Sequence, residues 1–71
     1  MKNYAFLVKE IEEGRFAENM RRGLYSNKLY LWLDVYAYHL AHPSLSSYVV
    51  GNKFGIDPKH VRTIYHYMEA D

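Results

Sequence analysis

The sequence predicts an all-α domain of four or five helices. Apolar residues recur at helical spacing along nearly the whole chain, and this period distinguishes a helix from a strand. Glycine and proline, which end or interrupt helices, divide the chain at Gly14, Gly23, Pro43, Gly51, Gly55 and Pro58. With 71 residues there is room for one domain, and we expect it to span residues 1–71.

The composition indicates a small folded core without covalent cross-links. Hydrophobic residues make up 49% of the chain and charged residues 24%, which excludes intrinsic disorder. Because cysteine is absent, the chain has neither disulfides nor thiolate zinc sites. Aromatic residues, 17% of the chain, each bury a large area and partly compensate for the small core. Packing or oligomerisation must supply the remaining stability.

The chain is expected to be soluble and cytoplasmic, with no membrane partner. Its most apolar stretch, Leu29 to Ala41, is interrupted by Asp34 and His39. That stretch is also shorter than the roughly 18 residues that a membrane-spanning helix needs. The apolar run from Tyr4 to Val8 is too short for the apolar region of a signal peptide.

Residues 1–26 are expected to form two helices. In the first, an i, i+3, i+4, i+7 stripe of apolar residues predicts one buried face: Tyr4, Leu7, Val8 and Ile11. A strand remains open there, because Tyr4, Phe6 and Val8 also alternate. The second helix is expected over 15–22, with Phe16 and Met20 on one side and Gly23 as the residue that ends it.

The third helix, 28–41, has the most regular apolar spacing and is expected to be the central helix. Asn27 is the predicted N-cap, and Pro43 requires the helix to end by His42. One predicted buried stripe comprises Leu29, Trp32, Leu33, Tyr36, Ala37 and Leu40. A second comprises Leu31, Val35 and Tyr38, and we expect it to meet either the N-terminal segment or a second subunit.

Residues 45–69 carry the pattern of two helices joined by a glycine turn, which is a helix-turn-helix unit. Ser44 or Ser46 can cap the first of them, and Gly55 then turns the chain. Asp57 is a predicted N-cap and Pro58 suits the first helical position. The last helix is therefore expected from Pro58 to about Glu69.

This segment resembles the bacterial and phage helix-turn-helix family of DNA-binding domains. The resemblance covers residues 46–66 and rests on apolar and small residues in the family's order and spacing: Val50, Gly51, Phe54, Gly55, Ile56, Val61 and Ile64. Gly51 is expected to let the two helices approach closely, while the apolar residues fill the angle between them. Residues 1–26 match no family pattern, so the subfamily stays open.

The last helix presents a polar stripe opposite its apolar one. At 100° per residue, Val61, Ile64, Tyr65 and Met68 lie on nearly the opposite side from Lys59, Arg62, Thr63 and His66. Because the polar stripe contains two cations, no acid and only side chains that form hydrogen bonds, it predicts contacts to base edges in a major groove. The resemblance further implies phosphate contacts from the preceding helix, here by Ser46, Ser47, Tyr48 and Lys53.

The local charge agrees with a nucleic-acid partner, although the net charge of +1 argues against a purely electrostatic binder. Residues 45–68 carry a local charge of +2, from Lys53, Lys59 and Arg62 against Asp57. Residues 15–28 add a local charge of +3. We expect a basic side of the molecule if these two segments pack together.

The expected function is sequence-specific binding of double-stranded DNA by a small transcriptional regulator. Such compact proteins look like regulators of phages, plasmids or other mobile elements, and binding to DNA would associate the protein with the nucleoid. A homodimer on a palindromic site is expected, because one short helix makes few contacts. Two alternatives stay open: the polar stripe is an ordinary solvated face, or the unit is a protein–protein interaction module without DNA binding.

Metal binding and catalysis are not expected. His39 and His42 share one helix, and His60 and His66 share another, but no cysteine or suitably spaced carboxylate completes a zinc site. Glycine patterns typical of nucleotide binding and nucleophile elbows are absent from the sequence. The sequence therefore predicts a protein that is not an enzyme and has no cofactor.

Overall fold

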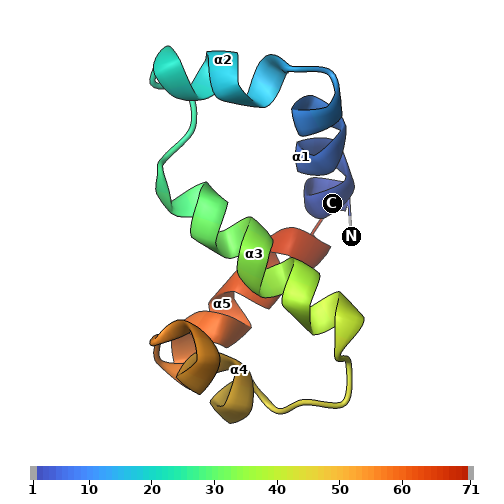
Figure 1. Ribbon diagram of the computed structural model, residues 1–71, viewed down its shortest axis with the longest axis vertical. Helices are drawn as coiled ribbons and strands as arrows, with labels where there is room; N and C mark the ends of the chain where they lie inside the picture. Colours follow the sequence, from blue (N-terminus) through green and yellow to red (C-terminus); the bar gives the residue numbers. More distant parts are fainter. Residues whose placement is uncertain (1, 71) are drawn as a thin grey trace.

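The computed structural model describes residues 2–70, and every regular element in this range is an α-helix. The helices are α1 (Lys2–Glu12), α2 (Arg15–Arg21), α3 (Lys28–Ala41), α4 (Ser47–Phe54) and α5 (Pro58–Glu69). Helix α3 crosses the middle of the molecule, with α1 and α2 towards one end and α4 at the other (Figure 1). The all-α prediction is confirmed, and the strand considered for the first segment is not formed.

The boundaries of α4 and α5 follow from local capping. Of the two serines considered, Ser46 is the cap, since its Oγ accepts a hydrogen bond from the Val49 N–H at 3.3 Å. The Asp57 carboxylate accepts one from the Lys59 N–H at 2.7 Å, and Pro58 follows it as the first helical residue. Between the helices Gly55 has φ of +71°, a left-handed conformation that glycine adopts without a steric penalty.

Asn27 is the N-cap residue of α3, as predicted, but its side chain does not act as the cap. Asn27 has helical dihedral angles, φ −59° and ψ −22°, and its side chain makes no capping hydrogen bond. Instead, the hydroxyl oxygen of Ser26 accepts a hydrogen bond from the Lys28 N–H at 3.2 Å. The other end agrees with the prediction, because α3 stops at Ala41 and His42 is the C-cap before Pro43.

Helices α1 and α2 pack against each other through a charged as well as an apolar contact. Leu7 is buried as predicted, but Ile11 is 48% exposed and Glu10, at 5%, is buried instead. The Glu10 carboxylate accepts hydrogen bonds from the Arg15 guanidinium and from the Tyr25 hydroxyl. The chain reverses after α2 at Gly23, whose φ of +78° is the glycine helix end that the sequence predicts.

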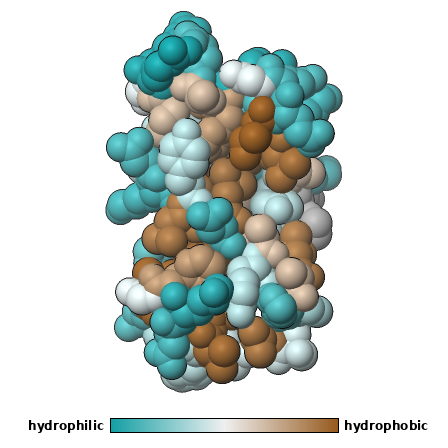
Figure 2. Space-filling view, in the orientation of Figure 1, coloured by the Kyte–Doolittle hydropathy of each residue, from teal (hydrophilic) through white to brown (hydrophobic). Residues whose placement is uncertain are grey.

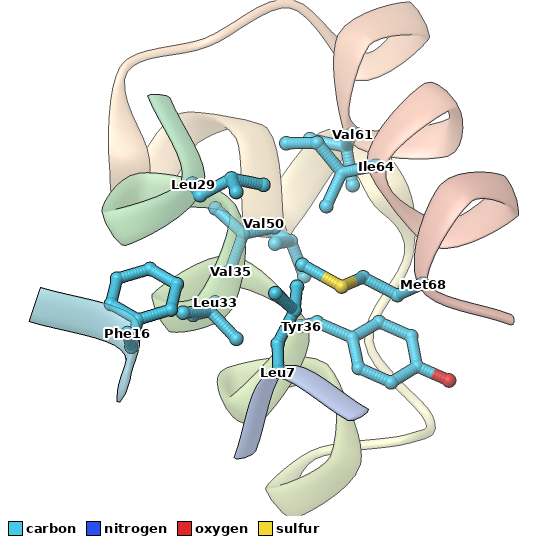
Figure 3. Close-up of a cluster of buried hydrophobic side chains, with 10 residues drawn as sticks. All are labelled: Leu7, Phe16, Leu29, Leu33, Val35, Tyr36, Val50, Val61, Ile64 and Met68. Atoms are coloured by element: carbon cyan, nitrogen blue, oxygen red, sulfur yellow. The ribbon is translucent and has the colours of Figure 1, made fainter. Parts of the chain in front are cut away.

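Side chains from all five helices form one core (Figure 3). Its most deeply buried members come from the three C-terminal helices: Val35, Tyr36, Val50, Val61, Ile64 and Met68. Leu7 of α1 and Phe16 of α2 extend this core towards the N-terminal end. The close packing of these side chains fixes α5 against α3 and α4.

Both apolar faces of α3 are covered by helices of the same chain, which corrects the prediction for its second stripe. Val35 is 0% exposed, and the Tyr38 ring packs edge-on against Phe54 of α4, with centroids 5.7 Å apart. On the other side, Trp32 packs edge-on against Tyr67 of α5 at 5.3 Å. In the second stripe, Val35 is therefore buried within one chain, Tyr38 packs on α4 and Leu31 is partly buried, so the stripe is not left open for a second subunit.

The first stripe of α3 is shorter than predicted. Leu29, Leu33 and Tyr36 are buried, but Ala37 is exposed and Leu40 is 41% exposed. The last turn of α3 is covered on one side only, because Tyr38 packs against α4 and His39 against α5 while Leu40 reaches the surface. The helical spacing of apolar residues alone does not show which of them a neighbouring helix buries.

The beginning of α1 lies against the end of α5. The Asn3 N–H donates to the carbonyl oxygen of Ala70 at 3.1 Å, and its side-chain Nδ2 donates to the carbonyl oxygen of Tyr67 at 2.8 Å. These bonds satisfy carbonyls that the end of a helix leaves without partners. Helix α5 is therefore held at its last turn by α1 and at its first turn by the turn from α4.

Candidate functional site

The outer face of α5 is the candidate site. On its predicted inner face, Val61, Ile64 and Met68 are each 0% exposed and Tyr65 is partly buried. The opposite residues are all exposed, and we call them the outer stripe: Lys59, Arg62, Thr63 and His66. The separation of the two faces agrees with the sequence prediction.

The turn before α5 brings its first residues close to α4. Gly51 is buried in α4, and an added Cβ there would lie 2.6 Å from the carbonyl oxygen of Ile56. The Ile56 N–H in turn donates to the Gly51 carbonyl at 2.9 Å. The sequence predicts close packing at Gly51, and the structure specifies the neighbour as the backbone of the turn.

Two hydrogen bonds orient side chains of the outer stripe. The Arg62 guanidinium Nη1 donates to Ser47 Oγ, the first residue of α4, at 3.0 Å. The Thr63 hydroxyl donates to the carbonyl oxygen of Lys59, one turn earlier in α5, at 3.1 Å. Thr63 therefore presents its methyl group and an acceptor oxygen outward, while Arg62 extends sideways towards α4.

The predicted phosphate-contacting residues divide into two groups. Ser47 lies beside the outer stripe through Arg62, and the neighbouring Tyr48 is 66% exposed. Ser46 is occupied as the cap of α4. Lys53 lies near the other end of α4, where its ammonium is 4.9 Å from the centroid of the Tyr38 ring. The structure thus brings Ser47 next to Arg62 and directs Lys53 towards α3.

Two of the four cations in the second basic segment, residues 15–28, form ion pairs. Arg15 pairs with Glu10 and Glu13, and Arg21 pairs with Glu18. The hydrogen bond that Arg15 donates to Glu10, followed by the one that it donates to Glu13, raises the pKa of the Arg15 guanidinium. Hydrophilic residues do gather at the end of the molecule that α2 forms (Figure 2). The excess positive charge predicted for 15–28 is nevertheless reduced there, because Glu10 of α1 and Glu13, just after α1, both pair with Arg15.

The histidines separate into packed and exposed side chains. His60 packs against Trp32, His39 stacks on Tyr65, and His42 contacts Tyr38. His66 in the outer stripe is exposed. Over residues 2–70, no three side chains of the metal-ligating types gather in one place. His39 and His60 therefore serve packing, while His42 is exposed although it contacts Tyr38, and His66 is the one that can reach a ligand from the outer stripe.

An aromatic cluster behind α5 is not part of the outer stripe. Burial, and then the charge of Glu69, raises the pKa of Tyr36, whose hydroxyl donates to Glu69 Oε2 at 3.2 Å. Burial also raises the pKa of Tyr65, again followed by Glu69. These shifts favour the neutral phenols, so the cluster supports the fold with uncharged rings.

Neither a cavity nor a membrane-spanning helix is found in the described part of the chain. No family model, no curated protein and no solved structure matches the sequence in comparisons with known proteins. The function is therefore inferred from the chemistry of the outer face of α5.

The pairing of Arg62 with Ser47 is the feature of the site that the sequence analysis missed. The two residues are 15 positions apart and lie on different helices. Their proximity depends on how tightly the turn folds at Gly51. The glycine itself is the only sequence feature that points to so close a crossing, and it does not identify which polar side chains meet.

Proposed function

We propose that the protein binds double-stranded DNA in a sequence-specific manner, with α4 and α5 acting as a helix-turn-helix and α5 entering the major groove. The observation that carries this proposal is the outer stripe. Its four side chains are exposed, two are cationic and none is acidic, on a helix whose opposite face packs into the core. Such side chains match the acceptor-rich edges of bases and the charge of the phosphates.

The size of the exposed face fits the groove. An α-helix with its side chains is about 10–12 Å across, and the major groove is about 12 Å wide. Helix α5 has 12 residues, so that it can follow the groove for several base pairs. Its position is fixed by α1, α3 and α4, which reduces the conformational freedom that binding would otherwise remove.

The proposal includes a homodimer and a regulatory role of the phage or plasmid type. One helix offers few base contacts, and two copies of α5 on successive major grooves, about 34 Å apart, would double them. Since Val35 is buried within one chain, the dimer would need a surface other than Leu31, Val35 and Tyr38. A protein of this kind acts in the cytoplasm and is associated with the nucleoid when bound.

The test is a selection of bound sequences from random duplex DNA, followed by titration of the preferred duplex. Lys59→Glu should weaken binding to that duplex by about 1–3 kcal/mol or more, because a base or phosphate contact is lost and an acid is introduced. The matched control is Lys9→Glu, which changes the net charge equally on α1. We expect the control to bind nearly as well as the wild type.

Two results would contradict DNA binding through α5. The first is a wild-type protein that enriches no duplex even at low salt. The second is equal weakening of DNA binding by Lys59→Glu and Lys9→Glu, which would show that the effect comes from the change in net charge and not from the position of Lys59. Circular dichroism of both variants establishes that they are folded.

A protein-interaction role is the second candidate, and exposed apolar side chains on α4 favour it. Tyr48 is 66% exposed and Val49 is 48% exposed, next to the outer stripe. Figure 2 shows hydrophobic residues reaching the surface at the end of the molecule that α4 forms. Protein interfaces use such residues as anchors. A protein that enriches no duplex, but whose Tyr48→Ala variant loses a protein partner, would support this second role.

A further inference from the structure

The hydrogen bond between Arg62 and Ser47 bears on which atoms of DNA each side chain of the outer stripe can reach. A sequence-based interpretation treats Arg62 as a base reader, because arginine pairs with guanine through two parallel hydrogen bonds. That geometry requires the guanidinium to extend from the helix towards the floor of the groove. In the structure it extends sideways instead, and its Nη1 lies 3.0 Å from Ser47 Oγ on α4.

The width of the major groove decides what lies next to such a side chain. The groove is about 12 Å wide, which accommodates a single helix about 10–12 Å across. With α5 in the groove, α4 must lie outside it, over the sugar–phosphate backbone at the edge. A guanidinium bound to the first residue of α4 is therefore beside the backbone and not above the bases.

Resting on the proposed DNA binding, we infer that Arg62 contacts a phosphate together with Ser47, and that sequence is read by Lys59, Thr63 and His66. Arg62 retains further N–H donors after its bond to Ser47, and the Ser47 hydroxyl retains its own proton to donate. Both can therefore bind one phosphate without breaking the bond between them. Ser47 acts as a positioning residue, since it holds the guanidinium in this direction.

The other members of the outer stripe keep their access to the bases. Lys59 and His66 are exposed, with no hydrogen bond to α4 in the described structure. The Thr63 hydroxyl donates its proton to the Lys59 carbonyl, so that its oxygen is left as an acceptor beside its methyl group. Thr63 therefore matches a thymine methyl or a base amino group and does not match a guanine acceptor.

The experiment compares Arg62→Ala with the wild type on two duplexes, the preferred one from selection and a scrambled one, over a series of salt concentrations. Loss of a phosphate contact should weaken binding to both duplexes by the same factor. The slope of log K against log salt should fall by about 0.9, the value for one phosphate. A repeated selection with Arg62→Ala should return the same preferred sequence.

Two further variants separate charge from geometry. Arg62→Lys should keep the salt slope of the wild type, because the cation is retained, and should keep the preferred sequence. Ser47→Ala should weaken binding to both duplexes, and it should weaken binding less when added to Arg62→Ala than when added to the wild type, since part of its effect acts through Arg62. The control is Arg22→Ala, at the C-cap of α2, which should change neither the salt slope nor the preferred sequence.

The results separate this inference from the proposed function. A relaxed preference at one base pair in Arg62→Ala, with an unchanged salt slope, overturns the phosphate role while DNA binding stands. Additive weakening by Ser47→Ala and Arg62→Ala overturns the positioning role of Ser47. A wild-type protein that binds neither duplex overturns both the inference and the DNA-binding function on which it rests.

Discussion

Gly51 and Ile56 approach each other more closely than any side chain at position 51 permits. An ideal Cβ on Gly51 would lie 2.6 Å from the Ile56 carbonyl oxygen, while the Ile56 N–H donates to the Gly51 carbonyl at 2.9 Å. The turn between α4 and α5 is thus folded directly onto the backbone of α4. This contact sets the position from which α5 starts, and with it the proximity of Arg62 to Ser47.

The first prediction is that Gly51→Ala destabilises the protein by about 1–3 kcal/mol, because the backbone of the turn has to move to accept a methyl group. This cost should outweigh the roughly 1 kcal/mol by which alanine favours a helix over glycine. Urea unfolding followed by circular dichroism measures the difference. The control is Asn52→Ala, at an exposed position of the same helix, where we expect a change below about 0.7 kcal/mol. A Gly51→Ala protein as stable as the wild type would contradict the close approach.

The second prediction concerns two tyrosines whose hydroxyls differ in their partners. The Tyr36 hydroxyl donates to Glu69 at 3.2 Å, whereas the buried Tyr65 hydroxyl has no hydrogen-bond partner among residues 2–70. At neutral pH, Tyr36→Phe should destabilise the protein by about 1 kcal/mol, since it removes the hydrogen bond that the Tyr36 hydroxyl donates to the Glu69 carboxylate. Tyr65→Phe should be neutral or stabilise by up to about 1 kcal/mol, because it removes an unsatisfied polar atom. Thermal unfolding of the two variants tests the difference, and a loss in Tyr65→Phe equal to that in Tyr36→Phe would refute it.

The third prediction is a loss of stability at alkaline pH. Burial, followed by the charge of Glu69, raises the pKa of Tyr36 and of Tyr65 above the ordinary value of about 10. Below this value both residues are protonated in the folded and the unfolded chain, so they add no pH dependence. Above it the unfolded chain loses protons first, and the free energy of unfolding falls as pH rises towards the folded pKa values. Urea titrations between pH 8 and 11 should show a smaller decrease in Tyr36→Phe/Tyr65→Phe than in the wild type. An equal decrease in both proteins would mean that groups other than Tyr36 and Tyr65 cause the loss of stability.

Local chemistry explains the parts of the fold that could be predicted. The Ser46 and Asp57 caps and the left-handed Gly23 and Gly55 each act within a few residues of the chain. Their positions therefore follow from sequence, and so do the ends of α4 and α5. The outer stripe is predictable for the same reason, since the helical period alone determines which residues lie opposite Val61.

Contacts between distant residues explain what could not be predicted. Glu10 is at the C-terminal end of α1, an unfavourable place for an anion, yet it is buried because Arg15 and Tyr25 reach it. The choice between α4 and a second subunit as the cover of Val35 likewise depends on the path of the chain after Pro43. Apolar spacing shows that a face is buried, but the identity of its partner is set by tertiary packing.

The last prediction follows from the burial of Val35 within one chain. Val35→Glu should unfold the protein, because a carboxylate at a position that is 0% exposed has no partner to offset its lost hydration. The control is Leu40→Glu on the same helix, 41% exposed, where the new charge remains in water and the protein should stay folded. Circular dichroism and sedimentation equilibrium on both variants and the wild type give the secondary structure and the mass. If Val35 instead lay at an interface between two copies, Val35→Glu would give a folded monomer from a wild-type dimer. That result would contradict the packing of α4 on α3 and restore the second stripe of α3 as the dimer surface.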